Sequence, residues 1–233
     1  MNFGKLYLVP NHLGEFDKDI LTDSIRNTIE RIDYYIFENE KPGRAYIKNI
    51  LPSKNQSELK IYLLNKKTNR DEINSFLGPC KVGFDMGLIS DAGCPGIADP
   101  GSEIIYNAHK IGIKVIPLIG PSSIFLALMS SGMNGQNFKF NGYLPIEKKE
   151  RKKAIITLEK KSLFTTQIFM ETPYRNNKLF NELLNVLKPE TKLCIACDVS
   201  LKSEFIKTME IKKWRTKKIE FNKRPSIFLI QSQ

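Results

Sequence analysis

Short apolar runs alternate with amphipathic stretches along the chain, and this alternation constrains the fold more than any other feature. Residues 6–9, 34–37 and 61–64 form apolar runs that are too short for helices, and stretches of helical periodicity separate them. Strands that alternate with helices over short connections are typical of a mostly parallel sheet. We therefore predict an α/β fold of two α/β domains, with a mostly parallel N-terminal sheet and a mixed C-terminal sheet.

The same patterns predict the individual elements. Strands are expected at residues 6–9, 34–37, 61–64, 81–86, 114–118, 138–140, 167–170, 193–197, 204–211 and 226–230. Helices are expected at residues 19–31, 44–50, 69–77 and 174–187. One further helix is expected to start near residue 103, another to end near residue 132, and a basic helix to lie within 148–161. Asn69 and Glu72 have the spacing of a capping box at the start of the third helix.

A segment rich in glycine and amide side chains, residues 132–137, is the best candidate for a domain boundary. It predicts an N-terminal domain over residues 1–133 and a C-terminal domain over 138–233. The last two predicted strands have no predicted helix between them. We expect them to form an antiparallel pair that closes the mixed sheet.

Composition indicates a soluble globular protein, since 41% of the residues are hydrophobic and 26% are charged. No apolar stretch has the length of a membrane helix, and the N-terminus lacks the pattern of a signal peptide. We expect a cytoplasmic protein without membrane contact. The net charge is +11, with seven Lys/Arg against two Glu over residues 148–161 and nine against three over 202–224. These basic clusters suit a nucleic-acid partner or reflect compositional bias, and both interpretations stay open.

The four cysteines are Cys80, Cys94, Cys194 and Cys197. A zinc site would need a second short pair of ligands, which Cys80 and Cys94 do not form. The pair Cys194 and Cys197 lies in a predicted buried strand, whereas the redox motif with this spacing opens a helix. We predict free structural thiols and no metal site.

The segment from Gly87 to Ser102 carries the strongest indication of a site. It follows a predicted strand, contains closely spaced glycines and prolines, and leads into a predicted helix, with Asp99 as the expected N-cap. Glycines allow a ligand to approach the backbone, and open α/β sheets bind ligands at the carboxyl ends of their strands. Asp91 would lie at such an end.

A second strand-to-helix turn, Gly120-Pro121-Ser122-Ser123, offers backbone amides and two hydroxyls that could hold a carboxylate or a ribose. It is equally consistent with an ordinary helix start. The chain has no Walker phosphate loop, no G-x-G-x-x-G fingerprint and no G-x-S-x-G nucleophile elbow. Of the two histidines, His12 follows the first strand and is a weak candidate, whereas His109 lies in a predicted helix.

Residues 90–101, SDAGCPGIADPG, resemble the S-D-A-G-T-P-x-I-S-D-P-G signature of the tetrapyrrole methylase superfamily. Further motifs follow in the family's order: GPSS at 120–123, FNGYLP at 140–145 and ETPYR at 171–175. The resemblance covers almost the whole chain and is strongest to the branch that contains the bacterial 16S ribosomal RNA cytidine 2'-O-methyltransferase. It implies two α/β domains, a homodimer, and S-adenosylmethionine as the methyl donor.

The resemblance also implies which residues bind the donor. In the N-terminal domain and the following turn these are Val9, Asp91, Ala92, Gly93, Cys94, Ile97, Pro121, Ser122, Ser123 and Ile124. In the C-terminal domain they are Met170, Cys197, Pro225 and Ser226.

The chain departs from the family where the acceptor should bind. The family's A-E-D-T-R-H-T after the second strand appears here as FENEKPG at 37–43, and R-E-L-T-K as DVSLK at 198–202. A ribose hydroxyl acceptor needs a base, for which Glu38 and Glu40 are the candidates, and Lys41 or Arg44 could orient a phosphate. These charged residues are equally consistent with a solvated loop.

Three functions are therefore compared. The first is 2'-O-methylation of ribosomal RNA in the small ribosomal subunit, which the basic clusters favour. The second is methylation of a small molecule, tetrapyrrole-like or other, which an uncharged acceptor site would favour. The third is a donor-binding protein without catalysis, that is, a binding module that retains the fold.

Overall fold

The structure is a computed structural model and describes residues 2–16, 22–65 and 68–232. The chain divides into two compact units, Met1–Ser122 and Ser123–Gln233. The strands of the first unit are β1 (Leu6–Val9), β2 (Tyr34–Phe37), β3 (Lys60–Leu63), β4 (Met86–Ile89) and β5 (Val115–Pro117). Its helices are α1 (Asp23–Arg31), α2 (Glu40–Ile50), α3 (Arg70–Ser75), α4 (Gly78–Lys81) and α5 (Ser102–Ile111).

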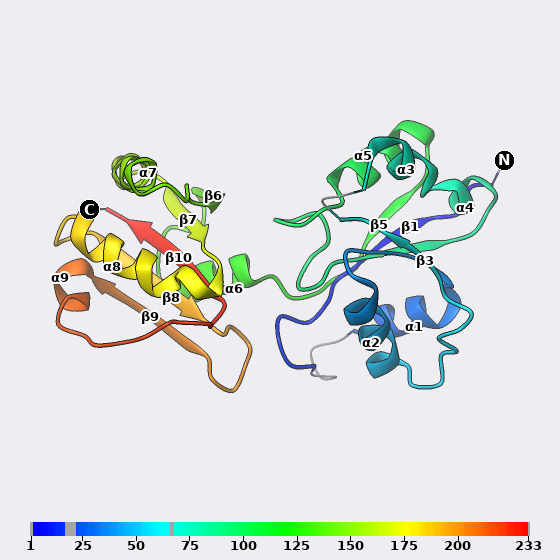
Figure 1. The fold of residues 1–233 in the computed structure, drawn as a ribbon, viewed down its shortest axis with the longest axis horizontal. Coiled ribbons are helices and arrows are strands. Elements are labelled where there is room, and N and C mark those ends of the chain that lie inside the picture. The colour runs from blue at the N-terminus through cyan, green and yellow to red at the C-terminus, as the bar shows by residue number, and fades with distance from the viewer. Residues whose placement is uncertain (1, 17–21, 66–67, 233) are drawn as a thin grey trace. The chain divides into compact units, whose positions relative to one another are not determined.

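The first unit is a parallel sheet with helices on both faces. Its strand order is β3-β2-β4-β1-β5, and every pair is parallel. Figure 1 shows α1 and α2 below the strands of this unit, and α3 and α5 above them. Val9, Phe37 and Ile89 stand in register at the ends of neighbouring strands. The loops that follow these strands therefore leave the sheet at one edge.

Burial on both faces explains the apolar runs of this sheet. Leu6, Met86 and Leu88 pack with α3, α4 and α5, whereas Tyr7, Val9 and the other alternate residues pack with α1 and α2. Successive side chains of a strand point to opposite faces. A strand covered by helices on both faces therefore needs apolar residues at nearly every position.

The second unit contains a mixed sheet. Its strands are β6 (Phe138–Tyr143), β7 (Thr166–Met170), β8 (Lys192–Cys197), β9 (Phe205–Glu210) and β10 (Ser226–Gln231). Its helices are α6 (Ser123–Ser131), α7 (Lys148–Lys161), the 3-10 helix η2 (Pro173–Arg175), α8 (Asn176–Val186) and α9 (Ile211–Trp214). The strand order is β6-β7-β10-β8-β9, in which only β6 and β7 are parallel.

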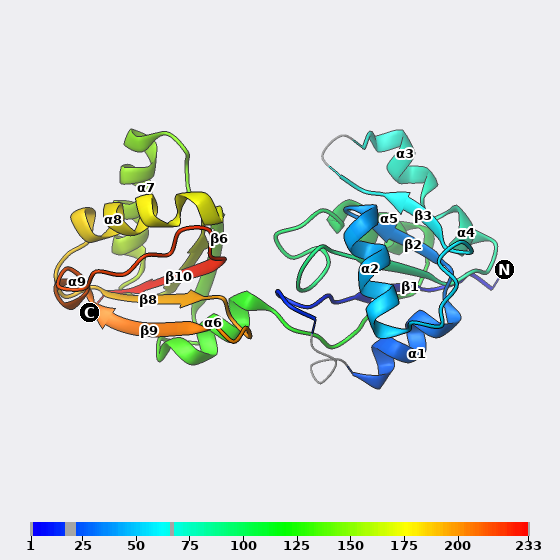
Figure 2. The same cartoon turned by 60° about the horizontal axis from the view of Figure 1, so that its bottom comes forward.

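Helices cover both faces of the second sheet as well. Residues of α7, α8 and α9 form one core with alternate residues of the strands, among them Trp214, Phe169 and Phe228. Helix α6 packs against β8, β9 and β10, and the Thr208 hydroxyl of β9 donates a hydrogen bond to the Ser131 carbonyl at 2.7 Å. Figure 2 shows α8 and α9 beside the strands of this unit.

The fold class predicted from the sequence is confirmed: one parallel sheet and one mixed sheet, each with helices. The contacts divide the chain between Ser122 and Ser123, whereas the prediction placed a linker at residues 132–137. Helix α6 accounts for this difference, because its buried residues pack on the second sheet. The glycine-rich segment is the turn between α6 and β6.

One predicted strand and one predicted strand pairing are wrong. The strand expected at 81–86 begins only at Met86, because Lys81 ends α4, Gly83 has φ 95° and Val82 is 73% exposed. The last two strands do not pair with each other. Strand β8 lies between them and pairs antiparallel with both, and the short helix α9 separates them in sequence.

Helix starts also differ from the prediction. Helix α2 begins at Glu40, before the expected start at Arg44, and α5 has Gly101 rather than Asp99 as its N-cap. The capping box of Asn69 and Glu72 is confirmed. The described part of α1 begins at Asp23, and the predicted helical residues 19–21 lie outside the described residues. Among the described residues, no helix combines the length and apolar character that crossing a membrane requires.

Candidate functional site

The predicted site residues of the first unit gather at the carboxyl edge of its sheet. Val9 ends β1, Glu38 follows β2, and Asp91 lies in the loop that follows β4. Because β2, β4 and β1 are neighbours and end in register, these loops leave the sheet beside one another. This is the edge where open α/β sheets bind ligands.

Residues 90–101 between β4 and α5 form a tight, glycine-dependent path, which we call the β4–α5 loop. Gly93, Gly96 and Gly101 have φ of 68°, 78° and 141°, values that side chains disfavour. Ala98 also has a positive φ, 64°. The Ser90 hydroxyl closes the first turn by donating to the Gly93 carbonyl at 3.1 Å. The loop therefore depends on glycines for its course.

Asn11, in the segment after β1, forms hydrogen bonds with the β4–α5 loop. Its side-chain amide donates to the carbonyl oxygens of Ser90 at 2.9 Å and Asp91 at 3.1 Å. Its backbone exchanges hydrogen bonds with Gly93, at 2.8 Å and 3.2 Å. Asn11 is 2% exposed, so these bonds are shielded from water. Sequence reasoning missed Asn11, although its place directly after the first strand was the available indication.

Three carboxylates lie close enough at this edge to influence one another. The Asn39 side-chain amide donates to Asp91 Oδ2 at 2.5 Å, which fixes that carboxylate. Burial, together with the charges of Glu38 and Asp91, raises the pKa of Asp99 to about 6. The edge thus has a negative potential and favours a cationic ligand. Sequence reasoning assigned Asp99 to a helix cap and missed this grouping.

The turn before α6 packs against the same loops. The Cys94 thiol donates to the Pro121 carbonyl at 3.4 Å, so two predicted donor-binding segments are in contact. A Cβ on Gly120 would lie 2.2 Å from Pro10 Cβ, so only glycine fits here. Ser122 ends the first unit.

Of the remaining predicted residues, Ile97 and Ala92 are exposed and Gly93 is buried.

The charged residues after Phe37 have local partners. Glu40 Oε1 accepts a hydrogen bond from Arg44 Nε at 2.8 Å, one turn further along α2. Arg44 also donates from Nη1 to the Gln56 carbonyl at 2.5 Å. Arg44 therefore ties α2 to the following loop, and its expected role in orienting a phosphate stays a prediction. Glu38 interacts with the β4–α5 loop through its charge.

His12 sits beside this edge in an aromatic environment. Its ring lies 5.7 Å from the Tyr46 ring, and the Tyr46 hydroxyl donates to the Pro10 carbonyl. Burial lowers the pKa of His12, so the neutral form is favoured at neutral pH. The buried Nδ1 has no hydrogen-bond partner among the described residues.

The predicted residues of the second unit also share one edge of their sheet. Ser226 stands opposite Cys197, and Ile227 next to it stands opposite Met170, so the three predicted residues are neighbours. The Asp198 amide donates to the Pro225 carbonyl at 2.9 Å. Cys197 is fully buried. Ser123 and Ile124 begin α6 in this unit.

A polar network that the sequence analysis missed holds this second edge. Asp198 Oδ2 accepts from Arg224 Nε at 2.7 Å and from the Ser203 hydroxyl at 2.9 Å. Buried Glu171 accepts from Arg175 Nη2 at 2.5 Å. Asp198 and Ser200 have positive φ values of 49° and 70°. The ETPYR motif contained the indication for the Glu171–Arg175 pair.

The cysteines are free thiols, as predicted. Burial raises the pKa of Cys194 and of Cys197, so both stay protonated at neutral pH. Within the described residues, no group of three or more His, Cys, Asp or Glu side chains could hold a metal ion. The first edge offers carboxylates and hydrogen-bonding groups, whereas the carboxylates of the second edge are paired with arginines.

The fold resembles those of methyltransferases that act on tetrapyrroles. The chain superposes on the methyltransferase CobJ with a TM-score of 0.66 at 14% identity, covering 98% of this chain and 94% of that one. It superposes on the uroporphyrin-III-C-methyltransferase of Thermus thermophilus with a TM-score of 0.55 at 18% identity, covering 98% and 92%. No protein-family model matches the chain. The chain therefore shares its two-sheet fold with these methyltransferases.

Sequence relatives narrow the assignment. The Leptospira borgpetersenii ribosomal RNA small subunit methyltransferase I is 35% identical over 208 residues, which cover 87% of this chain and 78% of the relative. Its Vibrio cholerae counterpart is 29% identical over 206 residues, 88% of this chain and 68% of the relative. The chain belongs to the ribosomal RNA small subunit methyltransferase I family and is a methyltransferase that uses S-adenosylmethionine.

Proposed function

We propose that this chain methylates a ribose 2'-hydroxyl of ribosomal RNA in the small ribosomal subunit. The names of its relatives support the RNA acceptor. The observation that carries the proposal is the acidic, glycine-shaped edge at the β4–α5 loop. There Asn39 holds the Asp91 carboxylate, and neighbouring negative charges help raise the pKa of Asp99.

The residues of this edge fit the methyl donor. S-adenosylmethionine has a sulfonium and an ammonium group, and a negative potential stabilises both. Asp91 would accept hydrogen bonds from the donor's hydroxyl or amino groups, while Gly93 and Gly96 allow close approach to the backbone. Val9, Ala92, Cys94, Ile97, Pro121 and Ser122 would complete the first unit's part of the site. In the second unit, the residues that we propose as donor contacts are Ser123, Ile124, Met170, Cys197, Pro225 and Ser226.

The donor supplies an activated methyl group for in-line displacement by the acceptor oxygen. The chain's residues must position that oxygen and remove its proton. We propose Glu38 and Glu40 as candidates for the base. Glu38 is the stronger candidate because its charge acts on the β4–α5 loop, whereas Glu40 is engaged with Arg44. Exclusion of water around the sulfonium would favour the charge-dispersed transition state.

We further propose that the protein is a cytoplasmic homodimer. A ribosomal RNA substrate would place it in the compartment that contains ribosomes. The four free thiols are consistent with a reducing compartment. Sedimentation equilibrium of the purified chain measures its mass in solution. A mass of twice the 26.7 kDa chain supports the dimer, and the monomer mass contradicts it.

The acceptor is tested with small ribosomal subunits from a strain that lacks the gene. The purified chain and isotope-labelled S-adenosylmethionine should introduce one labelled 2'-O-methyl nucleoside, detected by mass spectrometry of digested RNA. Glu38→Gln should lower kcat by roughly 10²- to 10⁴-fold, with a far smaller loss of donor affinity from the removed charge. Asp91→Ala should weaken donor binding measured by calorimetry.

Three results would contradict parts of the proposal. Absence of label in RNA from the gene-deleted strain, with the donor still bound, excludes RNA as acceptor and favours a small molecule. Donor affinity that Asp91→Ala leaves unchanged excludes the proposed donor site. A label on a base rather than on ribose would retain the RNA acceptor but exclude the 2'-hydroxyl.

A further inference from the structure

A cavity of about 470 Å³ opens at the other edge of the first sheet. It is lined by residues at the starts of the strands and in the segments before them, among them Arg31, Tyr34, Glu58, Lys60, Phe84 and Asp85. Because the donor loops leave the carboxyl edge, this cavity at the amino edge is a separate site of the same unit. Its size is within the range of small-ligand pockets.

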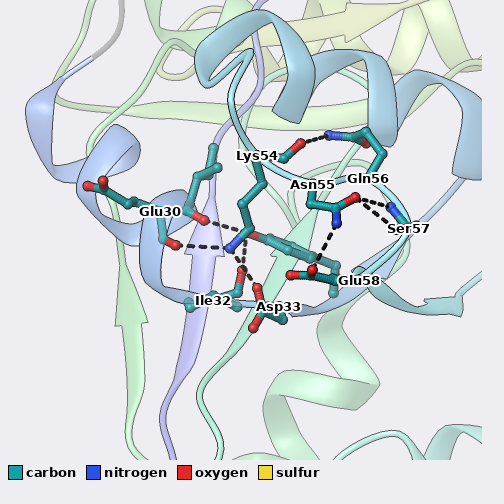
Figure 3. Close-up of polar contacts among 10 residues, drawn as sticks. Glu30, Ile32, Asp33, Lys54, Asn55, Gln56, Ser57 and Glu58 are labelled. Atoms are coloured by element: carbon teal, nitrogen blue, oxygen red, sulfur yellow. Dashed lines mark hydrogen bonds and ion pairs between the residues drawn. The ribbon is translucent and has the colours of Figure 1, made fainter.

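One wall of the cavity is the segment of residues 51–59 between α2 and β3, which is held firmly in place. Lys54 Nζ donates to Asp33 Oδ1 at 2.6 Å and to the Glu30 carbonyl at 2.9 Å. Figure 3 shows Lys54 reaching toward Glu30 and Asp33, and Asn55 directed toward Ser57 and Glu58. A wall fixed by these bonds needs little reordering when a ligand binds.

Two aromatic rings give the cavity an apolar surface. The ring centroids of Tyr34 and Phe84 lie 5.1 Å apart with an interplanar angle of 35°. Phe84 is 52% exposed, although it is among the most apolar side chains. Tyr34 also lines the cavity. Exposed aromatic faces beside polar groups are the stacking platforms that single-stranded nucleic acids use.

Among the described residues that line the cavity, Lys60 is the cation that no carboxylate pairs with. Asp85 is paired with Arg31 at 2.8 Å, and Asp33 is paired with Lys54. Lys60 stands beside Tyr34 in the register of β3 and β2, and its Nζ donates to the Tyr34 hydroxyl at 3.0 Å. That bond raises the pKa of Lys60 and uses one of three donor protons. The other two can reach an anionic group.

We propose that this cavity binds one unpaired nucleotide of an RNA strand. The base would stack on Phe84, which Tyr34 supports from its other side with Lys60 Nζ 4.8 Å from the Tyr34 ring centroid. Lys60 would contact the phosphate, and Glu58 would accept a hydrogen bond from a ribose hydroxyl or a base amino group. That the strand belongs to ribosomal RNA rests on the proposed function, whereas nucleotide binding does not. The site would anchor the substrate at a distance from the reacting hydroxyl.

The test measures fluorescence anisotropy of a labelled ten-nucleotide single-stranded RNA with the full chain. Phe84→Ala should weaken binding roughly five- to 100-fold, as loss of base stacking does. Phe84→Leu keeps the apolar bulk without the flat ring, and should weaken binding nearly as much. Lys60→Gln should reduce the slope of log affinity against log salt by about 0.7.

The first unit offers a matched control. Tyr106 on α5 is 61% exposed, and Lys110 Nζ lies 4.5 Å from its ring centroid, so the pair repeats the aromatic–lysine arrangement outside the cavity. Tyr106→Ala and Lys110→Gln should each leave the RNA affinity within about twofold of that of the parent chain. The slope of log affinity against log salt should change by no more than about 0.2. Circular dichroism confirms that each variant is folded.

Equal effects of the cavity and control variants would overturn the proposal, because binding would then be nonspecific. Competition by cytidine monophosphate as strong as that by the RNA strand would also overturn it, since a free nucleotide would be the ligand. Loss of RNA affinity in the cavity variants supports it, even if ribosomal RNA is not methylated. Methylation with normal KM in all cavity variants counts against this site but not against the proposed function.

Discussion

At the scale of single residues, neighbouring groups restrain the carboxylates at the edge where we propose that the donor binds. Asp91 was predictable because it belongs to a specific motif directly after a strand. Asn11 and Asn39 were not, because their roles depend on bonds to residues about eighty and fifty positions away in sequence, which no local pattern encodes. Asp99 was assigned to a cap that Gly101 in fact provides.

Asp99 should make stability depend on pH. Its pKa is raised from 3.8 to about 6, so the folded chain holds this proton more tightly than the unfolded chain. The ionised group therefore destabilises the fold above about pH 6, and this effect disappears as the pH falls toward 3.8. Asp99→Asn should stabilise the first unit by about 1 to 2 kcal/mol at pH 8. Near pH 4 the difference should vanish.

Thermal unfolding of the two proteins between pH 4 and pH 8 measures this difference. A gain that is constant with pH would indicate that the substitution acts through packing rather than through proton binding. Glu38→Gln provides a second comparison, because removing its charge should lower the pKa of Asp99 and reduce the gain.

Asn39 should affect the affinity for the donor without taking part in the methyl-transfer step. Asn39→Ala removes the hydrogen bond that fixes Asp91, so we expect donor affinity to fall roughly five- to tenfold. The control is Asn74→Ala, which removes an exposed amide bond to Asn107 elsewhere in the same unit. Calorimetric titration with S-adenosylmethionine compares the variants. An equal loss in both would show that the effect is general.

At the scale of helices, strands and loops, hydrophobic periodicity predicted most segments correctly. It failed where a strand-like alternation is exposed, as at Val82 and Phe84, which precede β4. The charge count along the sequence also placed Arg151 in a basic cluster. Arg151 is in fact 2% exposed, and its Nε pairs with Glu182 of α8 at 2.6 Å. A charge count along the sequence cannot distinguish a lysine in solvent from an arginine in a helix–helix contact.

The contact between the segment after β1 and the turn before α6 should depend on Gly120. A Cβ at this position would meet Pro10 Cβ at 2.2 Å, so Gly120→Ala must displace one segment. We expect a loss of about 1 to 3 kcal/mol in stability and weaker donor binding. Gly78→Ala is the matched control, since a Cβ there meets nothing within 4 Å and α4 favours alanine.

Urea unfolding and donor titration of both variants give the two readouts. The interpretation requires that Gly78→Ala be neutral or slightly stabilising. If Gly120→Ala bound the donor as tightly as the parent chain, the turn at Gly120 to Ser122 would have no part in the donor site.

At the scale of the whole molecule, the chain is two units that each bury their own core. The sequence predicted two α/β halves because the alternation of strands and helices resumes after residue 137. It placed the division after α6, since glycine and amide side chains are typical of linkers. Only the packing of α6 on the second sheet shows to which unit this helix belongs.

This packing predicts where the chain can be divided. A fragment of residues 123–233 should fold alone, because α6 covers one face of its sheet with Ile124, Ala127 and Leu128. A fragment of residues 133–233 should be poorly folded, since each lost apolar contact of this size contributes roughly 1.5 to 3 kcal/mol. Amide-proton dispersion in NMR spectra distinguishes the two. If both fragments are equally well folded, the domain boundary lies at residues 132–137, as the sequence predicted.

The position of β10 has a consequence for how the protein is made. This strand lies between β7 and β8, so the second sheet stays in two pieces until translation has passed Gln231. The first sheet needs only residues up to Pro117, and domains fold as units during synthesis. On the ribosome, the donor edge of the first unit would therefore be in place while the second unit still exposes unpaired strands. If translation paused before residue 226, the unpaired strands of the second unit would stay exposed and could be bound by chaperones.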